Sequence, residues 1–348
     1  MKVVITGATG NVGTALLRSL DGAGLELVGV ARRVPPRSRT EVRWISCDIG
    51  DPDAIPLLED AFRGADAVVH LAWAIDPRRD DPPMARTNGA GTEHVLRAVA
   101  AAAVPHLICA SSAAAYAPGP RWRQIDEDWP RTGVHGSAYS LGKAALESQL
   151  DAFERDQPSI RVARILPCGI TQAAAAAEMG DWLLPSWLPR SLIGRRWVPV
   201  PLWKDLRLQL VHADDVAQAI RLLLERRAAG AFNLAADPVL PAWALVGLFG
   251  GFRMPVSHRL AAVFARITWR LGVQPLHPGW LVLADRAALV DSGKARRELG
   301  WSPRWDATAT AAELARMLRA GRTGASAPLD PAPNDIRLGR PTHQSQDQ

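Results

Sequence analysis

Near its start the chain reads Thr6-Gly7-Ala8-Thr9-Gly10-Asn11-Val12-Gly13, directly after the apolar run Lys2-Val3-Val4-Ile5. Glycines at this spacing, between a strand and an amphipathic helix, are typical of a dinucleotide-binding turn. One glycine makes the tight turn, one lets the backbone approach a pyrophosphate, and one permits close packing of helix and strand. The helix N-terminus offers free N–H groups to the phosphates. The sequence therefore predicts a cofactor-binding turn made of Gly7, Thr9, Gly10, Asn11, Val12 and Gly13.

Beyond this turn, short apolar runs alternate with helical stretches rich in Ala and Leu. We expect strands at 3–6, 26–31, 42–47, 67–71, 106–110 and 161–166, and helices at 11–21, 52–62, 88–102, 138–156 and 213–226. Nearly all-apolar strands that alternate with helices predict an α/β fold with a Rossmann-type doubly wound parallel sheet.

The texture of the sequence changes after about residue 172, where Trp, Pro and Arg become frequent and no clean period remains. We expect a smaller, irregular C-terminal substrate lobe there. The predicted division is a NAD(P)-binding Rossmann domain at 1–172, to which the chain from about 211–235 returns, a mainly substrate-binding lobe at 173–320, and a disordered tail at 321–348. Two interpretations of the lobe tryptophans are weighted equally. In one they line the substrate site, and in the other they form the core of the lobe.

Composition narrows the class of protein. The 348 residues carry a formal net charge of +6 without a long Lys/Arg run, so nucleic acid is not an expected partner. Three scattered cysteines in or beside apolar runs suggest buried thiols in a reducing compartment. The first strand runs straight into the glycine turn, and no apolar run reaches the ~20 residues of a spanning helix. We expect a cytoplasmic protein without an integral membrane segment.

The end of the second predicted strand bears on the choice of dinucleotide. NAD-specific sites usually place a carboxylate there, whereas this chain has Ala31 followed by Arg32 and Arg33. Two guanidinium groups suit a 2′-phosphate. The alternative is that both arginines are solvated loop residues. NADP(H) is the preferred cofactor, and NAD(H) is not excluded.

A second pattern, Tyr139-Ser140-Leu141-Gly142-Lys143, falls on a predicted helix. A spacing of four places Tyr139 and Lys143 on one face, where an ammonium group lowers the pKa of a nearby phenol. Tyr139 can then exchange a proton with a substrate oxygen. The preceding strand ends in Ser111-Ser112, and ligands of open parallel sheets bind beyond such strand ends. An ordinary surface pair is the less favoured interpretation.

Taken together, these residues resemble the extended branch of the short-chain dehydrogenase/reductase superfamily, the NAD-dependent epimerase/dehydratase family. The resemblance spans residues 1 to about 305. Besides the glycine turn and the Tyr139–Lys143 pattern, it rests on motifs at 48–49, 69–72, 88–96, 111–116, 211–217, 232–234 and 291–301.

The resemblance implies a role for each matching residue. Ser112, Tyr139 and Lys143 are the expected catalytic residues, with Tyr139 as acid/base and Lys143 holding the nicotinamide ribose while lowering the tyrosine pKa. Asp215 is expected to be structural. The remaining expected cofactor contacts are Asp48 for the adenine amino group, Ile49, Leu71 and Ala72 at a strand end, Asn88 as a support from behind, Ser111, and Pro167 beside the nicotinamide.

Departures from the family pattern bear on the reaction. Sugar-nucleotide members commonly carry an Arg where this chain has Leu208, although the adjacent Arg207 could substitute. Ala113-Ala114-Ala115 lacks the acidic pair of dehydratases. We favour NADPH-dependent reduction of a ketone or aldehyde, or the reverse alcohol oxidation. The alternatives are a nucleotide-sugar epimerase or reductase and a non-catalytic NADP-binding regulatory protein.

A few further features complete the sequence-based picture. The basic amphipathic segment 259–271 is read as a lobe helix with one exposed basic face, in preference to a segment resting on a membrane surface. The Ala-rich helices at 88–102 and 138–156 permit a homodimer. The charged stretch 76–81 is expected to be a solvated loop. His212, Asp214 and Asp215 lack a third ligand at suitable spacing, so no metal is expected.

Overall fold

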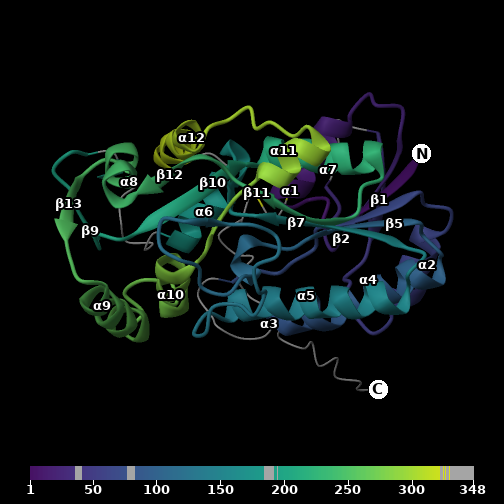
Figure 1. Ribbon diagram of the computed structural model, residues 1–348, viewed down its shortest axis with the longest axis horizontal. Helices are drawn as coiled ribbons and strands as arrows, with labels where there is room; N and C mark the ends of the chain where they lie inside the picture. The colour runs from purple at the N-terminus through teal and green to yellow at the C-terminus, as the bar shows by residue number, and fades with distance from the viewer. Residues whose placement is uncertain are drawn as a thin grey trace, which may run out of the picture.

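A seven-stranded parallel sheet forms the centre of the molecule (Figure 1). The computed structural model describes residues 1–35, 41–76, 83–183, 192–193, 195–321, 324, 326 and 329. Neighbouring strands follow the order β11-β7-β5-β4-β1-β2-β3. Their bounds are β1 (Lys2–Thr6), β2 (Glu26–Ala31), β3 (Val42–Ser46), β4 (Ala67–His70), β5 (His106–Ala110), β7 (Arg161–Pro167) and β11 (Gly230–Leu234).

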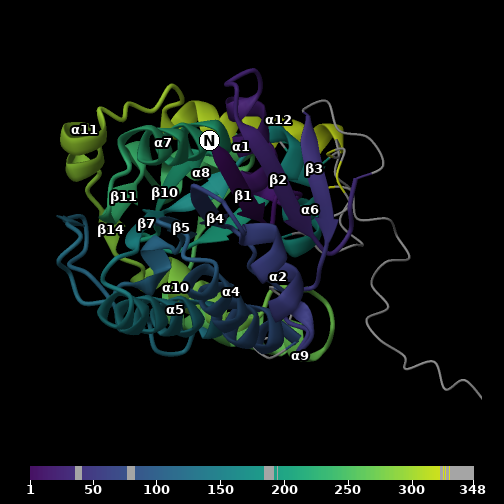
Figure 2. The same ribbon diagram turned by 90° about the vertical axis from the view of Figure 1, so that its right-hand side faces the viewer.

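Helices cover both faces of this sheet (Figure 2). One layer contains α1 (Asn11–Leu20), α7 (Ala213–Arg226) and α11 (Gly293–Leu299), and the other contains α2 (Ala54–Phe62), α4 (Gly91–Ala101) and α5 (Ala138–Asp156). Alternate residues of β1 enter different cores. Val3 and Ile5 pack in the cluster that includes α1 and α7, whereas Val4 packs in the cluster that includes α2 and α4. The predicted doubly wound α/β fold is confirmed.

The strands follow the sequence pattern closely, since every predicted strand is present with ends shifted by at most one residue. The helices expected at 138–156 and 213–226 are α5 and α7 with those bounds. The helix expected at 88–102 begins differently. A short helix α3 (Pro83–Ala85) and a π-helical turn η1 (Arg86–Ala90) precede α4.

Strand order reverses beside β1. From β1 the chain moves through β2 and β3 to one edge, then returns to β4 on the other side of β1 and continues through β5 and β7. At such a switch point, the connections leave the sheet in opposite directions and open a crevice at the strand ends. This crevice positions the candidate site. The late strand β11 completes the sheet beside β7.

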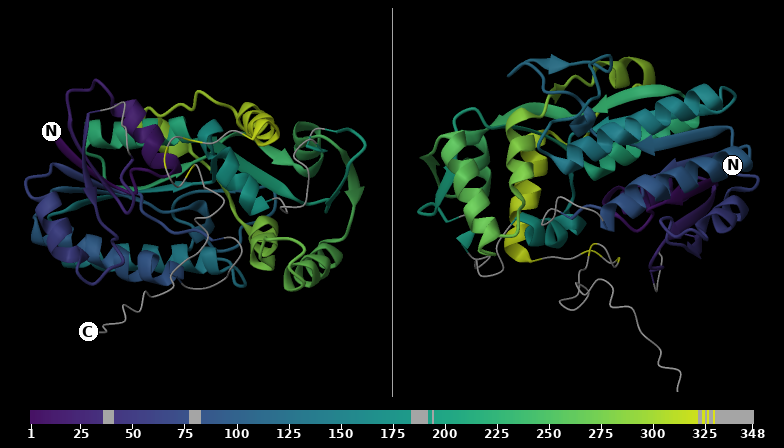
Figure 3. Two further views of the ribbon diagram at one scale, coloured as in Figure 1. Left: turned by 180° about the vertical axis from the view of Figure 1, so that it is seen from behind. Right: turned by 90° about the horizontal axis from the view of Figure 1, so that it is seen from below.

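The other end of the molecule is built from shorter elements (Figures 1 and 3). Its strands form three small sheets, β8-β10-β12, β9-β13 and β6-β14. The bounds are β6 (Gln124–Ile125), β8 (Gly169–Thr171), β9 (Pro199–Leu202), β10 (Arg207–His212), β12 (Ala236–Pro241), β13 (Phe252–Pro255), β14 (Leu289–Val290), α6 (Ala176–Leu183), α8 (Ala242–Phe249), α9 (His258–Arg270), α10 (Pro278–Arg286) and α12 (Ala307–Ala320), with the 3₁₀ turns η2 (Ala113–Ala115) and η3 (Ala173–Ala175).

Several sequence-based expectations fall partly outside the described residues, among them most of the loop at 76–81 and most of the tail at 321–348. Within the tail, Ser326 and Leu329 are buried, and the Ser326 hydroxyl donates to the Thr9 carbonyl at 2.7 Å. Among the described helices, none is long and apolar enough to cross a bilayer. All three cysteines are free thiols, and Cys47 and Cys109 are buried.

Candidate active site

A cleft of about 510 Å³ lies at the strand ends beside the reversal of strand order. It brings together every predicted catalytic and cofactor residue except Asn88, which lines an adjoining cavity of about 250 Å³. The predicted residues that line the main cleft are Gly7, Thr9, Gly10, Asn11, Val12, Gly13, Arg32, Arg33, Asp48, Ile49, Leu71, Ala72, Ser111, Ser112, Tyr139, Lys143 and Pro167.

The glycine turn has the shape that a dinucleotide pyrophosphate requires. Gly7 has φ +71°, and a Cβ there would lie 2.6 Å from the Ala72 nitrogen. A Cβ on Gly13 would lie 2.4 Å from the Gly7 carbonyl oxygen, so only glycine lets α1 approach the strand this closely. No side chain caps the start of α1, and its first N–H groups face an anion-binding position. These residues fit a bound dinucleotide.

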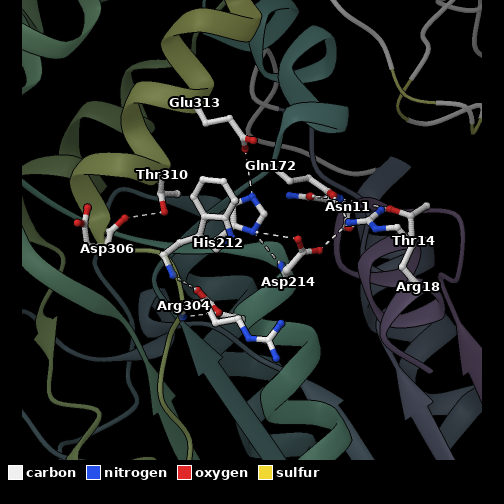
Figure 4. Close-up of polar contacts among 12 residues, drawn as sticks. Asn11, Thr14, Arg18, Gln172, His212, Asp214, Arg304, Asp306, Thr310 and Glu313 are labelled. Atoms are coloured by element: carbon white, nitrogen blue, oxygen red, sulfur yellow. Dashed lines mark hydrogen bonds and ion pairs between the residues drawn. The ribbon is translucent and has the colours of Figure 1, made fainter. Parts of the chain in front are cut away.

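A polar network supports this turn from the side of the lobe (Figure 4). The Gln172 amide donates to the Asn11 carbonyl at 2.6 Å, and Arg18 donates to Gln172 and to Asp214, both at 2.7 Å. His212 extends the network, because its Nδ1 accepts from the Asp214 N–H at 3.1 Å and its Nε2 lies 3.1 Å from Glu313. The start of α1 is therefore tied through β8 and α7 to α12.

At the opposite end of the cleft, β2 stops at Ala31 with no carboxylate, and the exposed Arg32 and Arg33 follow. Asp48 lies opposite them on the loop after β3. Its Oδ1 accepts from the Gly50 N–H at 3.0 Å, and its Oδ2 lies 2.6 Å from Arg86. This end of the cleft thus carries the two arginines, and the Asp48 carboxylate is fixed by its contacts with Gly50 and Arg86.

Tyr139 sits in the first turn of α5 because the Ser137 hydroxyl caps that helix, accepting from the Ser140 N–H at 3.4 Å. The Tyr139 ring stacks on Trp280 of α10, with centroids 5.0 Å apart and planes 29° apart. Burial raises the pKa of the Tyr139 phenol, and its hydrogen bond with Ser112 opposes that rise. The phenol is therefore protonated at neutral pH in this structure.

Lys143 lies one turn further along α5 and is 3% exposed. Its Nζ donates to the Ala110 carbonyl at 2.9 Å and lies 3.6 Å from the centre of the Trp73 ring. Burial lowers the pKa of Lys143 to about 7. The sequence predicted that Lys143 lowers the pKa of Tyr139; in the structure the ammonium is directed at Ala110 and Trp73, and the Tyr139 pKa is raised instead.

The remaining predicted residues hold backbone segments around the cleft. The Asn88 amide bridges Ala74, accepting from its N–H at 2.7 Å and donating to its carbonyl at 2.9 Å. The Ser112 hydroxyl accepts from the Ala114 N–H at 3.1 Å and donates to the Pro167 carbonyl at 3.5 Å. Ser111 lines the cleft as well, and its buried hydroxyl has no hydrogen-bond partner among the described residues.

The sequence-based site list lacks several residues in and beside the cleft. Trp73, which lines the cleft, contacts Lys143, and Trp280 contacts Tyr139. Trp182 and Glu178 of α6 also line the cleft. Burial raises the pKa of Glu178 to about 7. Trp73 directly follows the predicted strand-end residues, which is a usable signal. Trp280 follows Tyr139 by more than a hundred residues, and only the folded chain joins them.

The structure also shows the surroundings of Arg207 and Asp215, for which the sequence predicted roles. Arg207 is 4% exposed and donates to the carbonyls of Asp285 and Ala287 at 3.0 and 3.1 Å, so it closes the C-terminal end of α10. It is engaged there and is not among the residues that line the cleft. Asp215 accepts from the backbone N–H groups of Arg304 and Trp305, in keeping with a structural role.

Comparison with known proteins identifies the family. The model of the NAD-dependent epimerase/dehydratase family matches residues 3–235. The chain belongs to that family. It is therefore an enzyme of the short-chain dehydrogenase/reductase superfamily with a nicotinamide cofactor. No cluster of three or more His, Cys, Asp or Glu suited to a metal ion occurs within the described ranges.

Individual relatives share less than 30% sequence identity with this chain in the three comparisons that follow. An uncharacterised protein of Mycobacterium tuberculosis is 26% identical over 93% of this chain, which spans 31% of that protein's length. A 3-diazoavenalumate denitrifying reductase of a Streptomyces species is 29% identical over 87% of this chain and 96% of the relative. The NAD complex of UDP-glucose 4-epimerase from Thermus thermophilus has a TM-score of 0.67 and 19% identity, covering 92% of this chain and 99% of the epimerase. This last likeness shows the fold alone.

Proposed function

We propose that this enzyme reduces a ketone or aldehyde on an apolar or aromatic substrate, with NADPH as the preferred cofactor. Tyr139 is the proton donor, Ser112 holds the substrate oxygen, and Lys143 holds the nicotinamide ribose. The observation that carries the proposal is the partly buried Tyr139 side chain, which lines the dinucleotide cleft and stacks on Trp280.

The protonation state of Tyr139 supports the reductive direction. A carbonyl that accepts a hydride at carbon becomes an alkoxide, which takes a proton to give the alcohol. The raised pKa of Tyr139 keeps that proton on the phenol at neutral pH. A dinucleotide held by the glycine turn and Lys143 would supply the hydride. The Ser112 hydroxyl, hydrogen-bonded to Tyr139, orients the oxygen that receives the proton.

Aromatic residues beside Tyr139 support the substrate class. Trp280 stacks on the tyrosine, and Trp182 and Met179 of α6 line the same cleft. Such walls favour a flat apolar group, because aromatic rings gain from stacking as well as from burial. The Streptomyces relative is named a reductase, in keeping with a reductive reaction. Of the lobe tryptophans, Trp182 lines the cleft and Trp203 is 5% exposed in the lobe core, whereas Trp197 and Trp243 are exposed.

The NADPH preference rests on Arg32 and Arg33, which line the cleft after β2. A guanidinium group pairs well with a phosphate, and charge-assisted contacts of this kind contribute about 1.5–3 kcal/mol. Arg32→Ala should therefore weaken NADPH binding about tenfold or more and leave NADH binding nearly unchanged, measured by fluorescence titration. Arg43→Ala, on the neighbouring strand β3, is the control. Equal weakening for both dinucleotides would contradict the preference.

A nucleotide-sugar epimerase or reductase is the second candidate. Its main support is the family itself, and the engagement of Arg207 by α10 weighs against it. The two candidates separate in one experiment. Purified enzyme is incubated with NADPH and aryl ketones or aldehydes, and in parallel with UDP- and dTDP-sugars. Steady NADPH consumption with the carbonyl panel supports the proposal. Interconversion of a nucleotide sugar, or NADPH consumption with a nucleotide sugar alone, would replace it.

A further inference from the structure

Helix α9 turns an apolar face outward. Its residues Leu260, Val263, Phe264, Ile267 and Leu271, the last just past the helix end, are between 51% and 73% exposed. They recur at helical intervals of three and four, so they form one continuous stripe. The sequence predicted a lobe helix with one exposed basic face; its arginines are exposed, and this apolar stripe is exposed beside them. Soluble proteins rarely expose apolar stripes of this kind without a function.

The inward side of α9 explains why the apolar stripe faces solvent. Small or polar residues occupy that side, among them Ala261, which packs against the lobe core, and Thr268, which is 9% exposed. Helix α9 rests on α10 and β9 through this side. Since the inward face is already packed, the chain cannot bury the stripe by rotating the helix without losing those contacts.

A row of cations runs along one edge of the stripe. Arg259, Arg266 and Arg270 are exposed and recur at intervals of seven and four. None of the three forms an ion pair with any residue that the structure describes. From position 238 to position 284 the sequence contains four Arg and neither Asp nor Glu. This end of the protein is therefore cationic without internal compensation.

Apolar exposure continues onto neighbouring elements. Trp243 of α8 is 73% exposed and Phe252 of β13 is 51% exposed. Figures 1 and 3 place α8, β13 and α9 together at the end of the molecule opposite the N-terminus. The stripe thus belongs to a broader apolar end and is not an isolated feature of one helix.

We propose that the α9 stripe docks on an anionic lipid bilayer, with the stripe inserted at the headgroup level and the arginine row against lipid phosphates. An apolar face flanked by arginines is the composition that binds in the plane of such a surface. A second copy of the chain fits less well. Contact of two copies through this end brings no carboxylate from 238–284 to either arginine row. The proposal does not depend on the reaction assigned to the cleft.

The test is co-sedimentation of the full-length enzyme with vesicles. Binding to vesicles of equal parts phosphatidylcholine and phosphatidylglycerol should be at least tenfold tighter than to phosphatidylcholine alone, and should weaken as salt is added. Phe264→Glu should reduce binding at least tenfold. Arg266→Gln should reduce it about fivefold, the contribution of one arginine near an anionic surface.

A matched control is Leu57→Glu on α2, because Leu57 is also an exposed apolar side chain at 52%. It should leave vesicle binding unchanged. Thermal unfolding and dinucleotide titration check that each variant is folded. Equal binding to both vesicle types, or unchanged binding by Phe264→Glu, would overturn the proposal. So would failure to bind vesicles together with a dimer in light scattering that Phe264→Glu converts to monomer, since that result assigns the stripe to self-association.

Discussion

Arg164, in the main sheet, and Arg266, on α9, stand in opposite surroundings. The Arg164 side chain is 3% exposed and contacts the carboxylates of Glu147, Asp151 and Glu154. Arg266 is exposed within a stretch of chain that has no carboxylate at all. A buried charge must be neutralised nearby, whereas a solvated one need not be. The buried charge of Arg164 is thus paired within the sheet region, whereas helix α9 of the lobe presents apolar and cationic groups to solvent.

The candidate active site lies where these two regions meet. Tyr139 and Lys143 come from α5, which packs on the sheet, while Trp280 comes from α10 in the lobe. If the sheet region supplies chemistry and the lobe supplies selection, changes in the first should affect every substrate alike. Changes in the second should depend on the substrate.

The largest expected effect comes from Tyr139→Phe. Removing the proton donor should lower kcat/KM about 10²–10⁴-fold for every carbonyl substrate, with dinucleotide affinity nearly unchanged. Steady-state kinetics and dinucleotide titration measure the two quantities. Tyr116→Phe is the matched control, because Tyr116 is buried and its hydroxyl donates to Asn233 at 2.8 Å. It should cost about 1 kcal/mol of stability and spare turnover. Unchanged turnover in Tyr139→Phe would refute the assigned mechanism.

Gly13→Ala should come next in size. The new Cβ would meet the Gly7 carbonyl and the Ala8 backbone, so α1 must shift, at a cost of about 2 kcal/mol in the free energy of unfolding and with weaker dinucleotide binding. Gly247→Ala in α8 meets nothing within 4 Å and should stabilise the lobe by about 0.5–1 kcal/mol. Chemical denaturation compares the two. Similar changes in the free energy of unfolding at both glycines would contradict the claim that the cofactor turn is more closely packed than the lobe.

Trp280→Leu tests selection by the lobe. Loss of the ring that stacks on Tyr139 should raise KM for aryl ketones about 2–10-fold, since aromatic pairs contribute about 0.5–1.5 kcal/mol. Small aliphatic ketones should be affected much less. Parallel kinetics on both substrate types give the ratio. An equal loss for all substrates would contradict selection by the lobe and would assign Trp280 a part in the catalytic step.

The smallest predicted effect concerns Trp73 and the pH profile. The indole face favours the ammonium form of Lys143, so Trp73→Leu should lower the Lys143 pKa further from its value of about 7. Lys143 then loses its proton at lower pH, and the alkaline limb of the kcat/KM profile should move down by about half a pH unit. Trp73→Phe keeps a ring face and should move it less. A shift toward higher pH would contradict the role assigned to Trp73.

Local pattern explains what the sequence revealed. Apolar runs and glycine spacing reflect contacts made within a few residues or with adjacent strands, so the six predicted strands and the cofactor turn are confirmed as structural elements. Lys143 was placed on the same helix face as Tyr139 for the same reason. The stacking of Trp280 on Tyr139 and the hydrogen bonds from Arg207 to the end of α10 depend on contacts between distant parts of the chain. Periodicity within a short segment cannot predict such contacts.

Helix α9 shows the same limit in another form. Its sequence reveals two faces but not which one points inward. The outcome is set by the partners α10 and β9, which pack against small residues such as Ala261 and Thr268 and leave Phe264 in solvent. A pattern thus predicted the helix and its amphipathic character, whereas its orientation required the tertiary structure.

The central claim is net carbonyl reduction at Tyr139, and isotope transfer tests it most directly. The enzyme is incubated with NADPH deuterated at C4 and an aryl ketone, and the products are analysed by mass spectrometry. The proposed function predicts deuterium on the carbinol carbon of a released alcohol, together with NADP⁺, and loss of both products in Tyr139→Phe. Deuterium retained by the dinucleotide across the carbonyl panel, while a nucleotide sugar is interconverted, would contradict it.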